Sequence, residues 1–259
     1  MLHIEPVKAF KDNYLWVFHQ SDDTRAVVVD PGDAAPVQAW LQQQGLQLAA
    51  ILITHHHSDH IGGVSELQNA WHVPVYGPVS AKIPQVTNPL REGDKLVVAG
   101  MELRVLEVPG HTLEHIAYFA ADVDGSPLVF CGDTLFAAGC GRMFEGTPPM
   151  MYSSLQKLAS LPPDTRVYCT HEYTLSNLNF ARAALRDAPR VRTRIADEQL
   201  KRDRDEPTVP STIGLELQTN PFLRCDDPDV LAALASQQRL EQRDPALVFG
   251  ALRKWKDSF

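Results

Sequence analysis

The segment Thr54–His60 is the feature that most constrains this chain, because its sequence THHHSDH places four potential metal ligands within six residues. It follows the apolar run Ala49–Thr54, which is consistent with a buried strand. It precedes Gly62-Gly63, so we expect a turn that leads into a helix over Ile61–Asn69. The chain is therefore expected to present several ligands where a buried strand ends.

The candidate ligands in this segment are His55, His57, Asp59 and His60. Imidazole and carboxylate groups both bind zinc, iron and manganese. In an extended stretch His55 and His57 share one face and His56 points elsewhere, so His56 is excluded from the ligand set. The alternative is a surface loop that binds metal incidentally, and the position at a strand end argues against it.

Three further candidates follow predicted strands. His111 lies in VPGHT after Leu103–Val108, Asp133 in FCGDT after Leu128–Cys131, and His171 in YCTHE after Arg166–Cys169. Strand ends are where a sheet presents functional side chains at a common edge. Taken alone, Asp133 is more often a cap or a turn former. Five histidines and two aspartates at corresponding strand ends favour one shared site.

Seven candidate ligands exceed the about three or four protein ligands that one zinc ion takes, so they suit two ions that share a carboxylate. Two such ions can hold a hydroxide between them and polarise a carbonyl, which favours hydrolysis over a structural role. The cysteines form no CxxC pair, and we expect reduced, buried thiols at Cys131, Cys140, Cys169 and Cys225. A catalytic thiol is the alternative.

The composition argues against several classes of protein. The chain has 259 residues, 44% of them apolar, and a net charge of -8, with no run of Lys and Arg that would bind nucleic acid. No apolar run approaches the roughly 18–20 residues that span a bilayer, and the N-terminus lacks a signal-peptide pattern. We therefore expect a cytoplasmic monomer without nucleic-acid or membrane partners.

The sequence pattern changes near Thr170. Before it, short apolar runs alternate with turns, and a helix over Pro36–Gln44 is ended by Gly45. From about Tyr173 helical patterns dominate. We predict an α/β (α+β) fold, with a layered-sheet domain over residues 1–170 and a smaller helical domain over residues 171–259. Other predicted strands are Tyr14–His19, Arg25–Asp30, Val73–Tyr76, Lys95–Val98 and Ile116–Ala120, and other predicted helices are Met150–Ser160, Leu178–Leu185, Val191–Arg204 and Asp229–Gln237.

The ligand pattern resembles that of a known superfamily. THHHSDH is similar to the HxHxDH signature of the metallo-β-lactamase superfamily, and His111, Asp133 and His171 stand where its later ligands are expected. Within it, the whole chain resembles glyoxalase II, the hydroxyacylglutathione hydrolase family. The segments that carry this resemblance are DNYLW (Asp12–Trp16), VDPGDA (Val29–Ala34), GCGRMFEGT (Gly139–Thr147), THEYTLSNLNFA (Thr170–Ala181), TNPFLR (Thr219–Arg224) and LRKWKD (Leu252–Asp257). The implied fold is a metallo-β-lactamase-like αββα sandwich with a helical C-terminal domain that holds glutathione.

The resemblance implies two divalent metal ions, zinc in the first place, with iron and manganese as alternatives. One ion would be held by His55, His57, His111 and Asp133, and the other by Asp59, His60, His171 and the bridging Asp133. The implied glutathione contacts are Arg142, Phe144, Tyr173, Arg253 and Lys256. Phe144 departs from the family pattern, since many relatives have Tyr there, so we expect only apolar contact from it.

The implied activity is that of a thioester hydrolase acting on S-D-lactoylglutathione, a 2-hydroxyacylglutathione, to give D-lactate and glutathione in methylglyoxal detoxification. A metal-bound hydroxide would attack the thioester carbonyl, and Asp59 would act as a ligand, with proton acceptor as a second role. Asp30 is expected to form a turn or to orient a ligand histidine, and His115 to be a core residue. The alternatives are a persulfide dioxygenase with one iron, a lactonase, a β-lactamase or a nuclease on this fold, and a metal-binding or redox-sensing protein without activity.

Overall fold

The computed structural model describes residues 1–186 and 188–259. By its internal contacts the chain divides into two compact units. The first unit comprises residues 1–107 and 114–132, and the second comprises residues 108–113 and 133–259. The domain boundary at residue 170 stays a prediction.

The first unit contains a sheet of six strands in the order β1-β2-β3-β4-β5-β6. The strands are β1 (Leu2–Ala9), β2 (Asn13–Gln20), β3 (Arg25–Val29), β4 (Gln47–Leu52), β5 (Val75–Pro78) and β6 (Asn88–Leu90). Strands β1 to β3 pair in antiparallel fashion, and β3 to β6 pair in parallel. Because β3 and β4 are parallel neighbours, the residues that follow them, Asp30 and Thr54–His60, begin at the same edge of the sheet.

A second set of strands in this unit runs in the order β10-β9-β8-β7, with each neighbouring pair antiparallel. Its members are β7 (Lys95–Val98), β8 (Met101–Glu107), β9 (Ile116–Val123) and β10 (Ser126–Gly132). The two sets pack face to face, since Phe18 of β2 stacks on Phe130 of β10 with ring centroids 5.5 Å apart. Across the same layer, the buried hydroxyl of Tyr118 donates a hydrogen bond of 2.7 Å to the Ile53 carbonyl.

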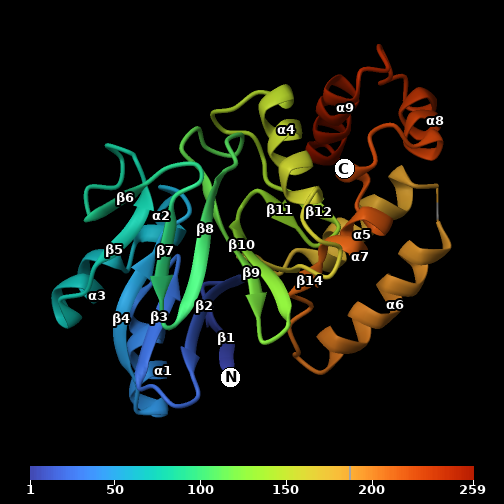
Figure 1. The fold of residues 1–259 in the computed structure, drawn as a ribbon. Coiled ribbons are helices and arrows are strands. Elements are labelled where there is room, and N and C mark those ends of the chain that lie inside the picture. Colours follow the sequence, from blue (N-terminus) through green and yellow to red (C-terminus); the bar gives the residue numbers. More distant parts are fainter. Residues whose placement is uncertain (187) are drawn as a thin grey trace. The chain divides into compact units, whose positions relative to one another are not determined.

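Helices cover the other face of the first sheet (Figure 1). They are α1 (Ala34–Gln44), the single-turn α2 (Ser58–Ile61) and α3 (Val64–Trp71). Leu41 and Leu67 of these helices share a buried cluster with Leu15, Val17 and Val28 of the sheet. The prediction that Gly45 ends the first helix is confirmed, because Gly45 has a φ of 67°, which glycine adopts without strain.

The single helix predicted over Ile61–Asn69 is wrong, because α2 and α3 are separate helices divided at Gly62-Gly63. A Cβ atom on Gly62 would lie 2.5 Å from the carbonyl oxygen of Gly32, and one on Gly63 would lie 2.5 Å from the amide nitrogen of Ala34. The two glycines therefore let the loop that carries Asp59 and His60 pack directly against the loop after β3.

The second unit is mainly helical. Its helices are α4 (Pro148–Ala159), α5 (Thr174–Ala184), α6 (Pro189–Asp203), α7 (Ile213–Thr219), the 3-10 helix η1 (Pro221–Leu223), α8 (Pro228–Ser236) and α9 (Pro245–Asp257). Its short strands form two antiparallel pairs: β11 (Leu135–Phe136) with β12 (Gly139–Cys140), and β13 (Arg166–Cys169) with β14 (Ser211–Thr212). Phe180, Phe222, Phe249 and Trp255 form an aromatic core between the helices, with centroid distances of 5.1–5.8 Å.

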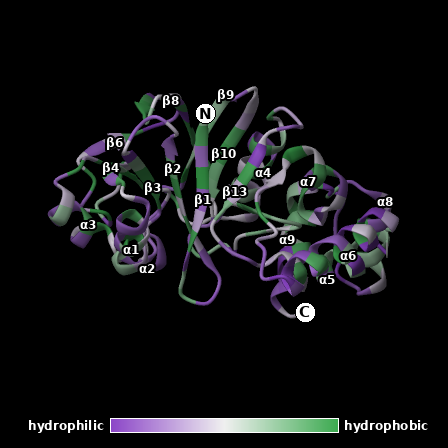
Figure 2. Cartoon of the chain, turned by 90° about the horizontal axis from the view of Figure 1, so that it is seen from below, coloured by the Kyte–Doolittle hydropathy of each residue, from purple (hydrophilic) through white to green (hydrophobic). Residues whose placement is uncertain are grey.

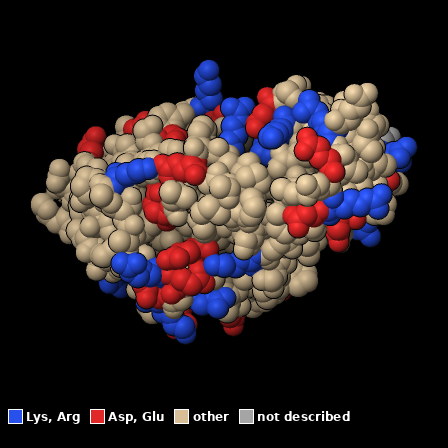
Figure 3. Space-filling view, turned by 90° about the horizontal axis from the view of Figure 1, so that it is seen from above, with Lys and Arg blue, Asp and Glu red and all other residues tan. Residues whose placement is uncertain are grey.

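Polar and apolar side chains are distributed according to their burial. Figure 2 shows β1 alternating between hydrophilic and hydrophobic residues, as expected of a strand at the edge of its sheet. On the face drawn in Figure 3, basic and acidic side chains are interspersed. The exposed ion pairs of the chain include Lys95–Glu102 and Arg204–Glu206. Within the described ranges, no helix combines the length and the apolar character that crossing a membrane requires.

Candidate metal centre

The loop after β4 brings together the four candidate ligands of the first unit. His55 and His60 are fully buried. The Nε2 atom of His55 lies 3.1 Å from Nδ1 of His57, and Nε2 of His60 lies 3.6 Å from Oδ2 of Asp59. Asp59 and His60 stand on the single-turn helix α2, for which His57 is the N-cap residue. The predicted ligands of this segment therefore lie in two close pairs, His55 with His57 and Asp59 with His60.

Two buried residues orient the imidazole rings. Thr54 donates its backbone N–H and its hydroxyl to the carboxylate of Asp30, each at 2.7 Å. The same Thr54 oxygen lies 3.1 Å from Nδ1 of His55, and Oδ2 of Asp30 lies 3.0 Å from Nδ1 of His60. Since the hydroxyl proton goes to Asp30, the His55 ring donates its Nδ1–H to Thr54 and carries its lone pair on Nε2. These contacts are those expected of a residue that orients a ligand histidine, and this role of Asp30 stays a prediction.

Asn13 is a contact that the sequence reasoning missed. It is buried at the start of β2, and its Nδ2 donates a 3.1 Å hydrogen bond to Oδ2 of Asp59. This bond fixes one oxygen of a carboxylate whose side chain is 38% exposed. The motif DNYLW contains Asn13, but nothing in its local pattern points to an aspartate 46 residues later.

The second unit contributes His111, Asp133 and His171, all buried. Oδ2 of Asp133 lies 3.4 Å from Nε2 of His111 and 3.4 Å from Nε2 of His171. His111 donates its Nδ1–H to the carbonyl oxygen of Arg142 at 2.8 Å, which leaves its lone pair on Nε2. Asp133 therefore stands between two imidazoles that belong to different predicted ligand sets.

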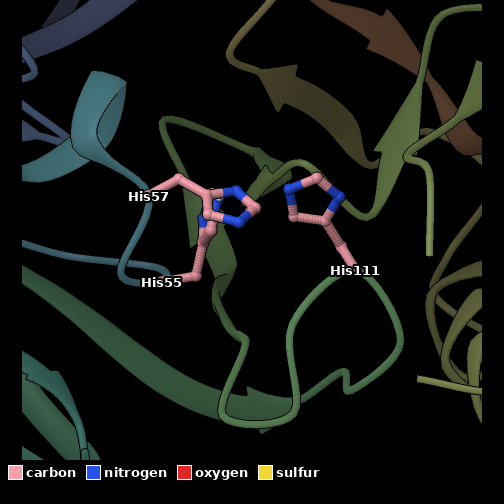
Figure 4. A group of neighbouring side chains, drawn as sticks. All are labelled: His55, His57 and His111. Atoms are coloured by element: carbon pink, nitrogen blue, oxygen red, sulfur yellow. Dashed lines mark hydrogen bonds between the residues drawn. The ribbon is translucent and has the colours of Figure 1, made fainter. Parts of the chain in front are cut away.

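The candidate ligands gather within each unit: His55, His57, Asp59 and His60 in the first, and His111, Asp133 and His171 in the second. Figure 4 shows the rings of His55 and His57 close together in the first unit. Five imidazoles and two carboxylates are donors that divalent ions such as zinc, iron and manganese accept, so the residues present fit a metal centre.

His56 is directed elsewhere, as predicted. Its Nδ1 lies 2.5 Å from Oε1 of Glu114. His115, expected to be a core residue, is fully buried and stacks on His55 with centroids 4.6 Å apart. Its stacking limits the rotation of the His55 ring.

The predicted glutathione contacts all lie in the second unit. Phe144 is 64% exposed and meets the His111 ring edge to face at 5.3 Å, and the partly exposed Tyr173 stacks on His171 at 4.7 Å. Both aromatic rings therefore adjoin candidate metal ligands. Whether these side chains contact glutathione stays a prediction.

The three predicted cationic contacts gather at the end of α9. Oδ1 of Asp257 lies 3.1 Å from Nη2 of the buried Arg253 and 3.5 Å from Nε of the exposed Arg142. Burial, followed by the charge of Arg253, lowers the pKa of Lys256. Three cations beside one carboxylate make a local basic cluster on an acidic chain.

The cysteines behave as the sequence predicted. All four are buried free thiols. Burial raises the pKa of Cys140 to about 11 and that of Cys169 to about 12, and it also raises the pKa of Cys225. These three thiols are therefore protonated at neutral pH, which argues against a nucleophilic role.

Comparisons with known proteins agree with this geometry. A family model described as metallo-beta-lactamase superfamily matches residues 12–171, and one described as hydroxyacylglutathione hydrolase C-terminus matches residues 172–259. The hydroxyacylglutathione hydrolase of Nitrosomonas europaea is 49% identical over 100% of this chain and 97% of its own length. That of Ectopseudomonas mendocina is 50% identical over 100% of both chains.

Two solved structures support the fold. ETHE1 from Myxococcus xanthus has a TM-score of 0.66 at 22% identity, covering 100% of this chain and 99% of that chain, which bears on the fold alone. TTHA1623, solved in a di-iron-bound form, has a TM-score of 0.59 at 30% identity, covering 85% of this chain and 100% of that chain. The predicted metallo-β-lactamase-like fold is thus confirmed. The chain belongs to the hydroxyacylglutathione hydrolase family of the metallo-β-lactamase superfamily.

Proposed function

We propose that this protein is a metal-dependent thioesterase that hydrolyses S-D-lactoylglutathione and related 2-hydroxyacylglutathiones to the hydroxy acid and glutathione. Membership of the family carries the class of reaction, since the curated relatives are named hydroxyacylglutathione hydrolase. The observation that supports metal dependence is the position of Asp133, whose Oδ2 lies 3.4 Å from Nε2 of both His111 and His171. These two histidines belong to different predicted ligand sets, as a bridging aspartate requires.

We propose zinc as the bound metal, held by His55, His57, His111 and Asp133 at one position and by Asp59, His60, His171 and Asp133 at the other. Iron is the alternative, because the relative TTHA1623 was solved in a di-iron-bound form. When bound, such ions lower the pKa of a coordinated water and polarise a carbonyl.

The protein's own side chains have separate tasks in this proposal. Asp30 and Thr54 hold the rings of His55 and His60 in one tautomer, and Asn13 holds one oxygen of Asp59. The partly exposed Asp59 keeps a second role as proton acceptor. The thiolate of glutathione is a good leaving group, so a strong general acid is unnecessary.

Substrate binding would use the residues around the second half of the site. The exposed ring of Phe144 and the face of Tyr173 offer apolar surface beside His111 and His171. Arg142 and Lys256 offer positive charge to the carboxylates of glutathione. The role in methylglyoxal detoxification, the cytoplasmic location and the monomeric state stay predictions.

The test is release of free thiol from S-D-lactoylglutathione by the purified protein, before and after a chelator strips its metal. Activity that disappears on stripping and returns with zinc, iron or manganese supports the proposal. Metal analysis of the untreated protein then distinguishes zinc from iron. No thiol release from protein that holds two metals would exclude the proposed reaction, and oxygen consumption with glutathione persulfide would favour a dioxygenase instead.

A further inference from the structure

The β11–β12 hairpin, Leu135–Cys140, begins just after Asp133 and is held by buried side chains from the C-terminal helices. Nδ2 of Asn220 donates hydrogen bonds to the carbonyls of Phe136 at 3.3 Å and Gly139 at 2.9 Å. Oε2 of Glu216 accepts the backbone N–H of Ala138 at 2.7 Å. Both Glu216 and Asn220 are fully buried, so water cannot replace these bonds.

The carboxylate of Glu216 is itself fixed by several donors. Its Oε1 accepts hydrogen bonds from Arg194, at 2.7 Å, and from the hydroxyl of Ser211. Its Oε2 also accepts the amide of Asn220 at 3.1 Å. A buried carboxylate is tolerated only when it is paired and hydrogen-bonded, and here each oxygen has two donors. Glu216 and Asn220 thus form one rigid polar group.

The hairpin needs such external support. A two-stranded hairpin of this size is marginal by itself. Its turn places Ala138 at a φ of 55°, a conformation that is strained for a non-glycine residue and persists only when the surroundings enforce it. The bond from Ala138 to Glu216 lies at this strained residue.

The hairpin and its flanks touch each candidate ligand of the second unit. At its exit, a Cβ atom on Gly141 would lie 2.0 Å from the carbonyl oxygen of Asp133, so the chain packs tightly on that residue. The next carbonyl, that of Arg142, accepts the Nδ1–H of His111. The Phe136 ring meets His171 edge to face at 5.7 Å.

We infer that Glu216 and Asn220 are positioning residues, which hold the Leu135–Cys140 hairpin and through it keep His111, Asp133 and His171 in a metal-binding arrangement. The inference rests on the proposed function only in taking these three residues as metal ligands. It gives Asn220, in the segment TNPFLR, a structural task, and it makes the C-terminal helices a structural part of the metal site.

The test is the nearly isosteric substitution Asn220→Asp. The variant keeps Oδ1, which accepts the N–H of Phe222 at 3.1 Å, and replaces the donor Nδ2 by an oxygen that repels the two hairpin carbonyls and Glu216. Asn220→Ser, which removes the amide without adding charge, is measured in parallel. The primary readout is zinc affinity, by competition with a chromophoric chelator, which needs no turnover. We expect the zinc affinity or the kcat of the Asn220 variants to fall about 10–100-fold. Their KM should stay within about two-fold of that of the unmodified protein.

Thr219→Val is the matched control. Thr219 is equally buried and adjacent, and its hydroxyl accepts a hydrogen bond from Arg194 and donates one to the Leu215 carbonyl, but it makes no hydrogen bond to the hairpin. We expect this variant to lower Tm as much as Asn220→Ser and to keep its zinc affinity. If both Asn220 variants lower only Tm and bind zinc like the unmodified protein, the inference is wrong. If the unmodified protein releases no thiol but the Asn220 variants still lose zinc, the proposed function fails and the inference stands.

Discussion

Oδ2 of Asp30 lies 3.0 Å from Nδ1 of His60, although α1 and β4 separate the two residues along the chain. The same carboxylate accepts both hydrogen bonds of Thr54, whose hydroxyl contacts His55. One buried carboxylate therefore orients a histidine from each of the two predicted metal sets. Asp30 has a φ of 50°, which Asp and Asn adopt more readily than other non-glycine residues.

Replacing Asp30 by Asn should weaken the metal site while preserving the backbone. The amide has about the same size and accepts the left-handed conformation, but it is neutral and has only one acceptor oxygen for His60 and Thr54. We expect a loss of about 10–100-fold in metal affinity or kcat, measured by chelator competition and thiol release. The control is Asp33→Ala, which removes the N-cap of α1 and should lower the free energy of unfolding by about 1 kcal/mol without changing kcat. Equal effects of the two changes on kcat would contradict the role given to Asp30.

The adjacent histidines His56 and His57 offer a direct test of the ligand set. Nδ1 of His57 lies 3.1 Å from Nε2 of His55, whereas His56 contacts Glu114. We expect His57→Ala to lower kcat at least about 100-fold, as expected when a group that acts in the reaction is removed, and to reduce the bound metal. His56→Ala should stay within about five-fold of the unmodified protein, because it removes only a partly exposed pair. Metal content by elemental analysis, together with kcat, measures both, and a reversed order would exclude the assignment.

The positions of the candidate metal ligands were predictable because their signal is local. His55, His111, Asp133 and His171 each stand a few residues after the end of a strand, and strand ends and ligand chemistry are both visible in the sequence. The end of α1 at Gly45 followed from a local signal in the same way. β1 was missed because it contains Pro6 and is partly exposed, both typical of an edge strand.

The supporting contacts were not predictable, apart from the role of Asp30, because they join residues far apart in the sequence. Asn220 bonds the hairpin carbonyls from more than 80 residues away, and neither partner has an unusual local pattern. The break between α2 and α3 has a similar origin. It depends on how closely Gly62 approaches Gly32, which is a property of packing and not of helix propensity.

Phe144→Tyr restores the hydroxyl that many relatives are expected to have. The ring is exposed beside His111, so the added hydroxyl meets no steric barrier in the second unit. If Phe144 faces glutathione, a new hydrogen bond worth about 0.5–1.5 kcal/mol should lower KM roughly two- to twelve-fold with little change in kcat. The comparison variant is Tyr173→Phe, which removes a hydroxyl on the other aromatic side chain and should raise KM. Unchanged KM in both variants would place the substrate elsewhere.

The buried cysteines predict that stability falls in alkaline solution. The ordinary thiol pKa is 9.0, and burial raises that of Cys140 to about 11 in the folded chain. Between these values the unfolded chain has lost the thiol proton and the folded chain keeps it, so the free energy of unfolding decreases as pH rises. This contribution is complete below pH 9 and is lost as pH passes through 11, at up to about 1.4 kcal/mol per pH unit for one thiol. Urea unfolding across this range measures the slope, and Cys140→Ala should make it shallower than in the unmodified protein because one titrating thiol is removed. The other titrating groups are the same in both proteins. Identical slopes of the free energy of unfolding against pH would therefore mean that solvent reaches the Cys140 thiol.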